Sequence, residues 1–131
     1  MMVGVPREVF PGERRVALVP GVVPNLAKAG MEVVVEAGAG VEAGYSDTEY
    51  TSKGAKVVRS RGDVFSGADV IVQVLGHGSN DRTGSADLAL MRRGQVLIGF
   101  LRPLGELHTL QEIAATGVTS FSVELMPRIT R

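Results

Sequence analysis

The sequence predicts an α/β domain with a mostly parallel sheet and helices on both faces, in a flavodoxin-like or Rossmann-like three-layer arrangement. Short β-branched runs alternate with segments of helical character, and strands separated by helices imply crossover connections and therefore parallel pairing. The runs at 70–75 and 96–101 are almost continuously apolar, which is typical of strands buried on both faces. A count of 17 glycines also fits a fold with many tight strand–helix junctions.

Strands and helices are expected to alternate along the chain. Each strand segment is a short apolar or β-branched run bounded by glycine, proline or polar residues. The expected strands are residues 2–5, 31–37, 55–58, 68–75, 95–101 and 118–123. The expected helices are residues 20–30, 46–54, 63–68 (a short helix or turn), 85–94 and 105–117.

Local signals support three of these helices. The first has apolar residues at helical spacing and ends at Gly30, although its prolines leave the start open. In the second, Ser46 is followed three residues later by Glu49, which is the pattern of a capping box. In the fourth, Leu88 and Met91 are expected to face inward.

Composition narrows the classes of function. A length of 131 residues predicts one domain. Fourteen basic and fourteen acidic side chains cancel and aromatic residues are only 5%, so no nucleic-acid partner is expected. The chain has no cysteine, which excludes disulfides and cysteine nucleophiles. The longest apolar runs are far shorter than the ~20 residues that span a bilayer, and no signal peptide is visible, so no direct membrane insertion is expected.

The stretch 38–44 is similar to a dinucleotide-binding loop but departs from its pattern. That loop requires Gly-x-Gly-x-x-Gly between a strand and a helix, so that the pyrophosphate meets free N–H groups at the helix N-terminus. Here three residues separate Gly40 from Gly44, and the helix starts later, at Ser46. Glu42 also adds a negative charge where a phosphate would lie. The stretch therefore predicts a glycine-bent loop at a strand end.

The two histidines give no catalytic or metal-binding pattern. His77 lies in a polar loop, where a solvated side chain is expected, and His108 lies near a helix start. Asp81 and Asp87 could approach His77, but no set of ligands has the spacing of a metal site. No Gly-x-Ser-x-Gly elbow is present either.

Arginines gather where the predicted strands end. Arg15 follows the loop after the first strand, Arg102 follows the fifth, and Arg128 and Arg131 follow the sixth. Open parallel sheets bind ligands at the carboxyl ends of their strands, and arginine binds carboxylates and phosphates through two parallel hydrogen bonds. Gln73 lies inside an apolar strand and requires hydrogen-bond partners. These residues predict an anion-binding edge.

Three segments resemble the N-terminal domain shared by alanine dehydrogenases and the α subunit of proton-translocating NAD(P) transhydrogenases. They read "VGVPREVFPGERRVALVP", "LAKAGMEVVVEAGAG" and "ELMPRITR", and they occur in family order from residue 3 to 131. The second segment contains the glycines of the 38–44 stretch, so the resemblance assigns them to a strand-end turn.

The resemblance is closer to the transhydrogenases than to the alanine dehydrogenases. Alanine dehydrogenases use an arginine for the substrate carboxylate, a lysine and an acid/base histidine. Arg15 matches the arginine, but Gln73 stands at the lysine's position and Arg102 at the histidine's. Direct hydride transfer between two nicotinamides needs no such acid/base pair. In the transhydrogenases the motif's first arginine lines the nicotinamide, and Arg128 matches it.

The resemblance further implies that residues 1–131 are the N-terminal domain of a larger two-domain NAD(H)-binding protein. A Rossmann domain that binds most of NAD(H) would follow, and a later helix would return to complete the first domain. The implied partners are the membrane and NADP(H)-binding components, with a homodimer in the full protein. The implied location is cytoplasmic and peripheral to the membrane. The isolated chain is expected to be inactive.

Two alternatives stay open at this point. One is an alanine dehydrogenase-like, NAD-dependent amino-acid dehydrogenase. The other is a non-enzymatic module that binds a small anion through Arg15 and Arg102.

Overall fold

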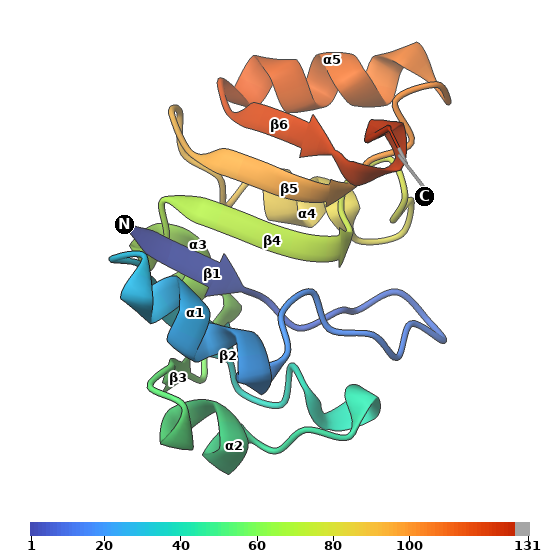
Figure 1. Ribbon diagram of the computed structural model, residues 1–131. Helices are drawn as coiled ribbons and strands as arrows, with labels where there is room; N and C mark the ends of the chain where they lie inside the picture. The colour runs from blue at the N-terminus through green and yellow to red at the C-terminus, as the bar shows by residue number, and fades with distance from the viewer. Residues whose placement is uncertain (128–131) are drawn as a thin grey trace.

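Six parallel strands form one sheet in the order β3-β2-β1-β4-β5-β6 (Figure 1). The strands are β1 (Met2–Val5), β2 (Glu32–Glu36), β3 (Lys56–Val58), β4 (Val70–Leu75), β5 (Val96–Phe100) and β6 (Thr119–Ser122). This is the Rossmann order, in which the direction of winding reverses between β1 and β4. The computed structural model describes residues 1–127.

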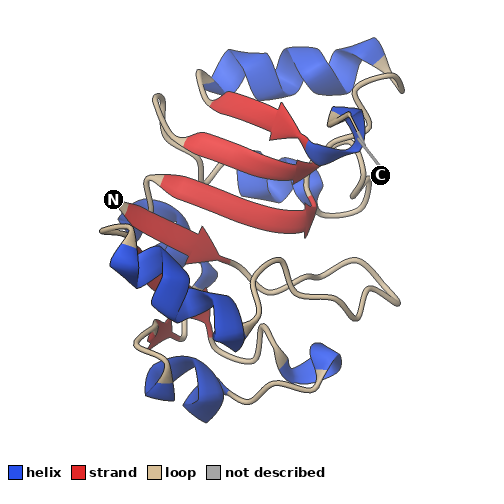
Figure 2. Cartoon of the chain, viewed as in Figure 1, coloured by secondary structure: helices blue, strands red, loops and turns tan. Residues whose placement is uncertain are grey.

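Helices connect every pair of consecutive strands (Figure 2). They are η1 (Pro20–Val22), α1 (Val23–Lys28), η2 (Val41–Ala43), α2 (Asp47–Ser52), α3 (Arg61–Gly67), α4 (Gly84–Leu88) and α5 (Leu107–Thr116), with η3 (Val123–Leu125) after β6. In Figure 1, α1 lies in front of the sheet and α3 and α4 lie behind it, so the expected α/β arrangement with helices on both faces is confirmed.

Each face of the sheet has its own hydrophobic core. The front core joins Val33 and Val35 of β2 to Val23 of α1 and Tyr50 of α2. The rear core joins the intervening Val34 to α3, β4 and β5. Alternate residues of one strand thus enter opposite cores, because successive strand side chains point to opposite faces. This burial on both sides explains the near-continuous apolar strands.

The expected elements are all present, and their boundaries agree within two residues except at the end of α4. The capping box is confirmed, since the Ser46 hydroxyl accepts the Glu49 N–H and the Glu49 carboxylate accepts the Ser46 N–H. Helix α3 begins at Arg61, two residues earlier than expected. Helix α4 ends at Leu88, well before the expected residue 94. The next N–H groups, of Leu90 and Met91, bond to carbonyls three residues back, and the N–H of Arg92 is accepted by the Gln95 side chain and not by a helix carbonyl.

The glycine-rich stretch 38–44 is a structural loop. The N–H of Gly38 donates to the carboxylate of Asp47 at 2.8 Å. A Cβ at position 40 would lie 2.7 Å from the Tyr50 ring, so the chain packs closely here. Gly38 and Gly44 have φ values of 78° and 88°, which favour glycine. These backbone conformations and the close packing at Gly40 give the stretch its glycines, and its first N–H is bound by a carboxylate of the protein itself.

The front face of the second half of the sheet is open. Val72, Ile98 and Phe121 pair in register across β4, β5 and β6 and form one apolar row. Phe121 is 56% exposed. Among residues 1–127, no helix covers this part of the sheet (Figure 1).

Candidate functional site

A cavity of about 600 Å³ lies at the carboxyl ends of β4, β5 and β6. Arginines from two loops line it together with apolar side chains: Arg15, Leu75, Phe100, Arg102, Leu104 and Leu125. Its position matches the rule that ligands of open parallel sheets bind beyond the carboxyl ends of the strands. A cavity that is mainly apolar and has a few charged groups is typical of a small-molecule site.

Arg15 reaches this cavity from the long loop after β1. Its guanidinium donates two hydrogen bonds to Glu13, at 2.8 and 2.7 Å, and its carbon lies 5.7 Å from the centre of the Phe100 ring. The hydrogen bonds from Arg15 hold the pKa of the Glu13 carboxyl below its ordinary value. A guanidinium has five N–H donors, so Arg15 is fixed by Glu13 and Phe100 and still has donors for a ligand.

Arg102 follows β5, two residues after Phe100. Its side chain is exposed and lines the same cavity as Arg15. It also lines a smaller cavity of about 210 Å³ beside the first turn of α5. The structure therefore brings Arg15 and Arg102 to one cavity, as two of the arginines expected at this edge.

Gln73 lies deeper than the two arginines. It contributes to the lining of a second cavity, of about 380 Å³, which Arg15 and Phe100 also line. The Gln73 side chain is buried, and its amide donates to Asp87 on α4 at 2.8 Å. Its Oε1 has no hydrogen-bond partner within residues 1–127. Gln73 was expected to need hydrogen-bond partners, and Asp87 is the partner of its N–H donor.

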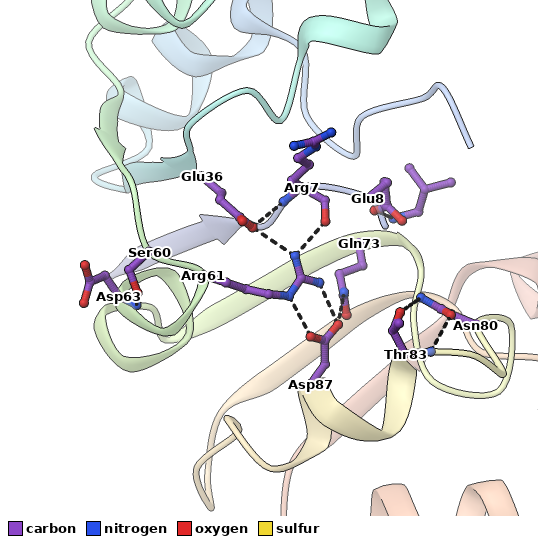
Figure 3. Close-up of polar contacts among 11 residues, drawn as sticks. Arg7, Glu8, Glu36, Ser60, Arg61, Asp63, Gln73, Asn80, Thr83 and Asp87 are labelled. Carbon is purple, nitrogen blue, oxygen red and sulfur yellow. Dashed lines mark hydrogen bonds and ion pairs between the residues drawn. The ribbon is translucent and has the colours of Figure 1, made fainter. Parts of the chain in front are cut away.

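Asp87 is the buried centre of a polar network whose other charged members are partly exposed (Figure 3). Arg61 donates to both oxygens of Asp87, at 2.7 and 2.8 Å, and to Glu36 at 2.9 Å. It also donates to the carbonyl of Arg7. The network joins the end of β2, the loop after β1, and helices α3 and α4, and through Gln73 it reaches β4, which lines the 380 Å³ cavity.

Glu8 joins the two halves of the sheet at the point where the winding reverses. Its carboxylate accepts the N–H groups of Val74 and Leu75, at 2.6 and 3.1 Å. β1 ends at Val5 and leaves these groups of β4 without a strand partner, and the Glu8 side chain takes that place. Burial raises the pKa of the Glu8 carboxyl despite these two hydrogen bonds.

The raised pKa of Glu8 predicts a pH dependence of stability. A carboxyl that holds its proton more tightly in the folded state stabilises the fold below its ordinary pKa of 4.5. That contribution is lost as the pH rises through the higher pKa of the folded state. The free energy of unfolding of the wild type minus that of Glu8→Gln should therefore fall between about pH 4.5 and neutrality.

Urea denaturation at a series of pH values measures this difference. Glu32→Gln is the matched control, because Glu32 is exposed at the start of β2. A difference for Glu8 that increases with pH over the same range would contradict the prediction.

His77 is not the solvated loop residue that the sequence suggested; that interpretation is wrong. It is 7% exposed, and its Nε2 lies 2.6 Å from a carboxylate oxygen of Glu112 on α5. The contact joins positions 35 residues apart, and no local pattern reveals it. Asp87, which could have approached His77, is bound to Arg61 instead, whereas His108 is exposed beside Glu106.

Three expectations from the sequence concern the arginines near the C-terminus, metal binding and membrane insertion. Arg128 and Arg131 lie outside the described residues, so Arg128 stays a predicted nicotinamide contact. Within residues 1–127, no three His, Asp or Glu side chains are grouped as metal ligands would be. Over the same range, no helix combines the length and the apolar character needed to cross a membrane.

Sequence and structure comparisons identify similar proteins. Residues 4–131 match the family described as alanine dehydrogenase/PNT, N-terminal domain. NAD(P) transhydrogenase subunit alpha of Cereibacter sphaeroides is 38% identical over 131 residues, which are 100% of this chain and 24% of that protein. The crystal structure of a transhydrogenase from Sinorhizobium meliloti matches 99% of this chain with 35% identity and a TM-score of 0.88, over 37% of its own length.

An L-alanine dehydrogenase structure is also similar. It matches 95% of this chain with 32% identity and a TM-score of 0.84, over 32% of its own length. The chain therefore spans only 24–37% of these proteins. Two relatives named as transhydrogenase α subunits are 38% and 37% identical to this chain, whereas the L-alanine dehydrogenase is 32% identical.

Proposed function

Because this chain belongs to the alanine dehydrogenase/PNT N-terminal domain family, we propose that it is the N-terminal domain of the NAD(H)-binding component of an NAD(P) transhydrogenase. The complete enzyme would transfer hydride between NAD(H) and NADP(H). The nicotinamides carry out that chemistry, and the protein supplies position and electrostatics. Relatives named as transhydrogenase α subunits support the proposal.

The 600 Å³ cavity, called the main cavity from here on, bears on whether the enzyme is a transhydrogenase or an alanine dehydrogenase. Its described lining contains Arg15 and Arg102 but neither a lysine nor a histidine, and His77 and His108 line the smaller cavity that shares Arg102 instead. Glu124 is its one carboxylate, and that group accepts backbone N–H bonds from Leu101 and Arg102. Deamination of an amino acid requires a proton carrier beside the substrate, whereas direct hydride transfer requires none. This lining therefore favours the transhydrogenase.

The rest of the enzyme follows as part of the same proposal. NAD(H) would be bound mainly by a following Rossmann domain, with Arg128 as a contact of this chain to the nicotinamide. NADP(H) would be bound by a partner component, and a membrane component would couple hydride transfer to proton translocation. The protein would be a homodimer on the cytoplasmic side, held at the membrane through its partners.

The open sheet face supports a larger protein around this domain. The row Val72, Ile98 and Phe121 is apolar and uncovered by the described helices, and apolar surface of this kind usually has a binding partner. The matched relatives are about three to four times longer than this chain. We propose that a helix from the following part of the protein covers this face.

The isolated 131-residue chain is predicted to bind NADH only weakly. It contains no Gly-x-Gly-x-x-Gly sequence, and the N–H of Gly38 in its most similar loop is bound to Asp47, so this loop does not offer a pyrophosphate the cradle of N–H groups that a dinucleotide site has. Isothermal titration calorimetry with NADH should give no dissociation constant in the submillimolar range. Submillimolar binding would contradict the prediction.

Two assays on the full-length protein that carries this chain test the function. NADH-dependent reduction of an NADP analogue in the presence of its partner components should be observed. Alanine-dependent reduction of NAD should be absent, and robust activity would assign the protein to the alanine dehydrogenases, which the similar L-alanine dehydrogenase structure makes the second candidate. Absence of both activities would favour the module that binds a small anion.

A further inference from the structure

Arg102 has an unusual backbone conformation. With a φ of 49°, it is the one non-glycine residue in the left-handed region among residues 1–127. L-amino acids rarely adopt this region, because Cβ then approaches the carbonyl oxygen. Pro103 follows directly, and a residue before proline is normally extended. Local sequence therefore opposes the conformation that Arg102 adopts, so tertiary contacts must hold it.

Glu124 supplies those contacts from η3. Its Oε1 accepts the N–H of Arg102 at 2.6 Å and that of Leu101 at 3.0 Å, while the carbonyl of Arg102 accepts the N–H of Gly105 at 2.9 Å. Partial burial acts to raise the pKa of the Glu124 carboxyl, but hydrogen bonds from Ser122 and from backbone N–H groups hold that pKa below its ordinary value. Glu124 is therefore an anionic acceptor bound to the backbone at the end of β5.

The conformation of Arg102 decides where its guanidinium can reach. In the left-handed conformation the side chain lines both the 600 Å³ cavity and the 210 Å³ cavity. An extended residue at the same position would project its side chain in a different direction. The chain thus maintains an unfavourable backbone at a cleft, which is where such strain is usually retained for function.

We propose that Glu124 is a positioning residue, whose carboxylate holds Arg102 in the left-handed conformation and directs its guanidinium to anionic oxygens of the ligand in the cleft. A guanidinium suits phosphate and carboxylate oxygens, to which it donates two parallel hydrogen bonds. The identity of that ligand as NAD(H) rests on the proposed function. The role of Glu124 in holding the backbone does not.

A double-mutant cycle of melting temperatures tests whether Glu124 holds the backbone of Arg102. It uses the 131-residue chain, which has two hydrophobic cores of its own. Glycine removes the strain at position 102, so Arg102→Gly should raise the melting temperature by roughly 3–6 °C. In the Glu124→Ala background the residue is free to relax, and the same substitution should have little effect. Arg14→Gly, at an exposed loop position with ordinary φ, should not raise the melting temperature.

NADH binding by the full-length protein tests the ligand part. Arg102→Gly and Glu124→Ala should each weaken binding about tenfold or more, although the first variant is the more stable protein. Glu124→Gln keeps one oxygen acceptor and should restore part of the affinity. A purely structural role would instead make affinity follow stability.

The outcomes separate the two proposals. Equal effects of Arg102→Gly in both backgrounds, or wild-type NADH affinity of the Arg102→Gly protein, would overturn the role of Glu124. If the melting temperatures change as expected but the wild type binds no NADH, the proposed function is wrong. The role of Glu124 in fixing the backbone of Arg102 is then still supported.

Discussion

Replacing Asp87 by alanine is expected to lower the free energy of unfolding by about 3–5 kcal/mol. Asp87 is 3% exposed and accepts two hydrogen bonds from Arg61 and one from Gln73. Its removal leaves the partly buried guanidinium of Arg61 without its main partner and the buried amide of Gln73 without its acceptor, and both groups lost contact with water when the chain folded. Glu36 remains bound to Arg61 but lies on the other side of it in Figure 3.

Urea denaturation followed by circular dichroism measures this loss. Asp81→Ala is the matched control: Asp81 is exposed in the loop before α4, so its replacement should change the free energy of unfolding by at most about 0.5 kcal/mol. Asp87→Asn keeps the shape and one acceptor oxygen and should fall between the two. A loss below about 1 kcal/mol for Asp87→Ala would show that the network is not needed to hold the strand ends together.

Local sequence patterns predicted the helices and strands, because each element has its own short-range signal. The β-branched runs fixed all six strands, and Ser46 with Glu49 fixed the start of α2. The predicted end of α4 was wrong, because beyond Leu88 the helical bonding stops and the N–H of Arg92 is accepted by the side chain of Gln95, a buried residue just before β5. The spatial order of the strands could not be predicted from local patterns, since it is decided by packing between distant segments.

The candidate site was predictable only in part, for the same reason. The positions of Arg15 and Arg102 after strands indicated the sheet edge at which open parallel sheets generally bind ligands, and both line one cavity there. Glu8 and Arg61 were missed because their partners lie 66 and 26 residues away. One signal was available: Asp87 interrupts the apolar residues of "SADLAL". The left-handed Arg102 before Pro103 contradicts local preference, so sequence reasoning could only have predicted the opposite.

Gly78→Ala is expected to be the most damaging substitution in the loop that follows β4. Gly78 has a φ of 96°, and a Cβ at this position would lie 2.1 Å from the carbonyl oxygen of Leu101. Leu101 is 1% exposed, so its backbone cannot move aside without disturbing the rear core. The substitution adds the strain of a left-handed alanine to the overlap, and the total loss should be about 2–5 kcal/mol.

Gly54→Ala separates these two contributions. Gly54 has nearly the same φ, 97°, but an added Cβ would meet no heavy atom within 4 Å, so this variant should lose only about 1–2 kcal/mol. The overlap also has a functional consequence, because the loop of Gly78 carries Ser79, and Ser79 and Arg102 both line the main cavity. If Gly78→Ala forces this loop away from Leu101, NADH binding by the full-length protein should weaken, while Gly54→Ala should leave it unchanged. Equal losses of stability in the two variants would mean that the loop yields freely and that its close approach to Leu101 does not shape the cleft.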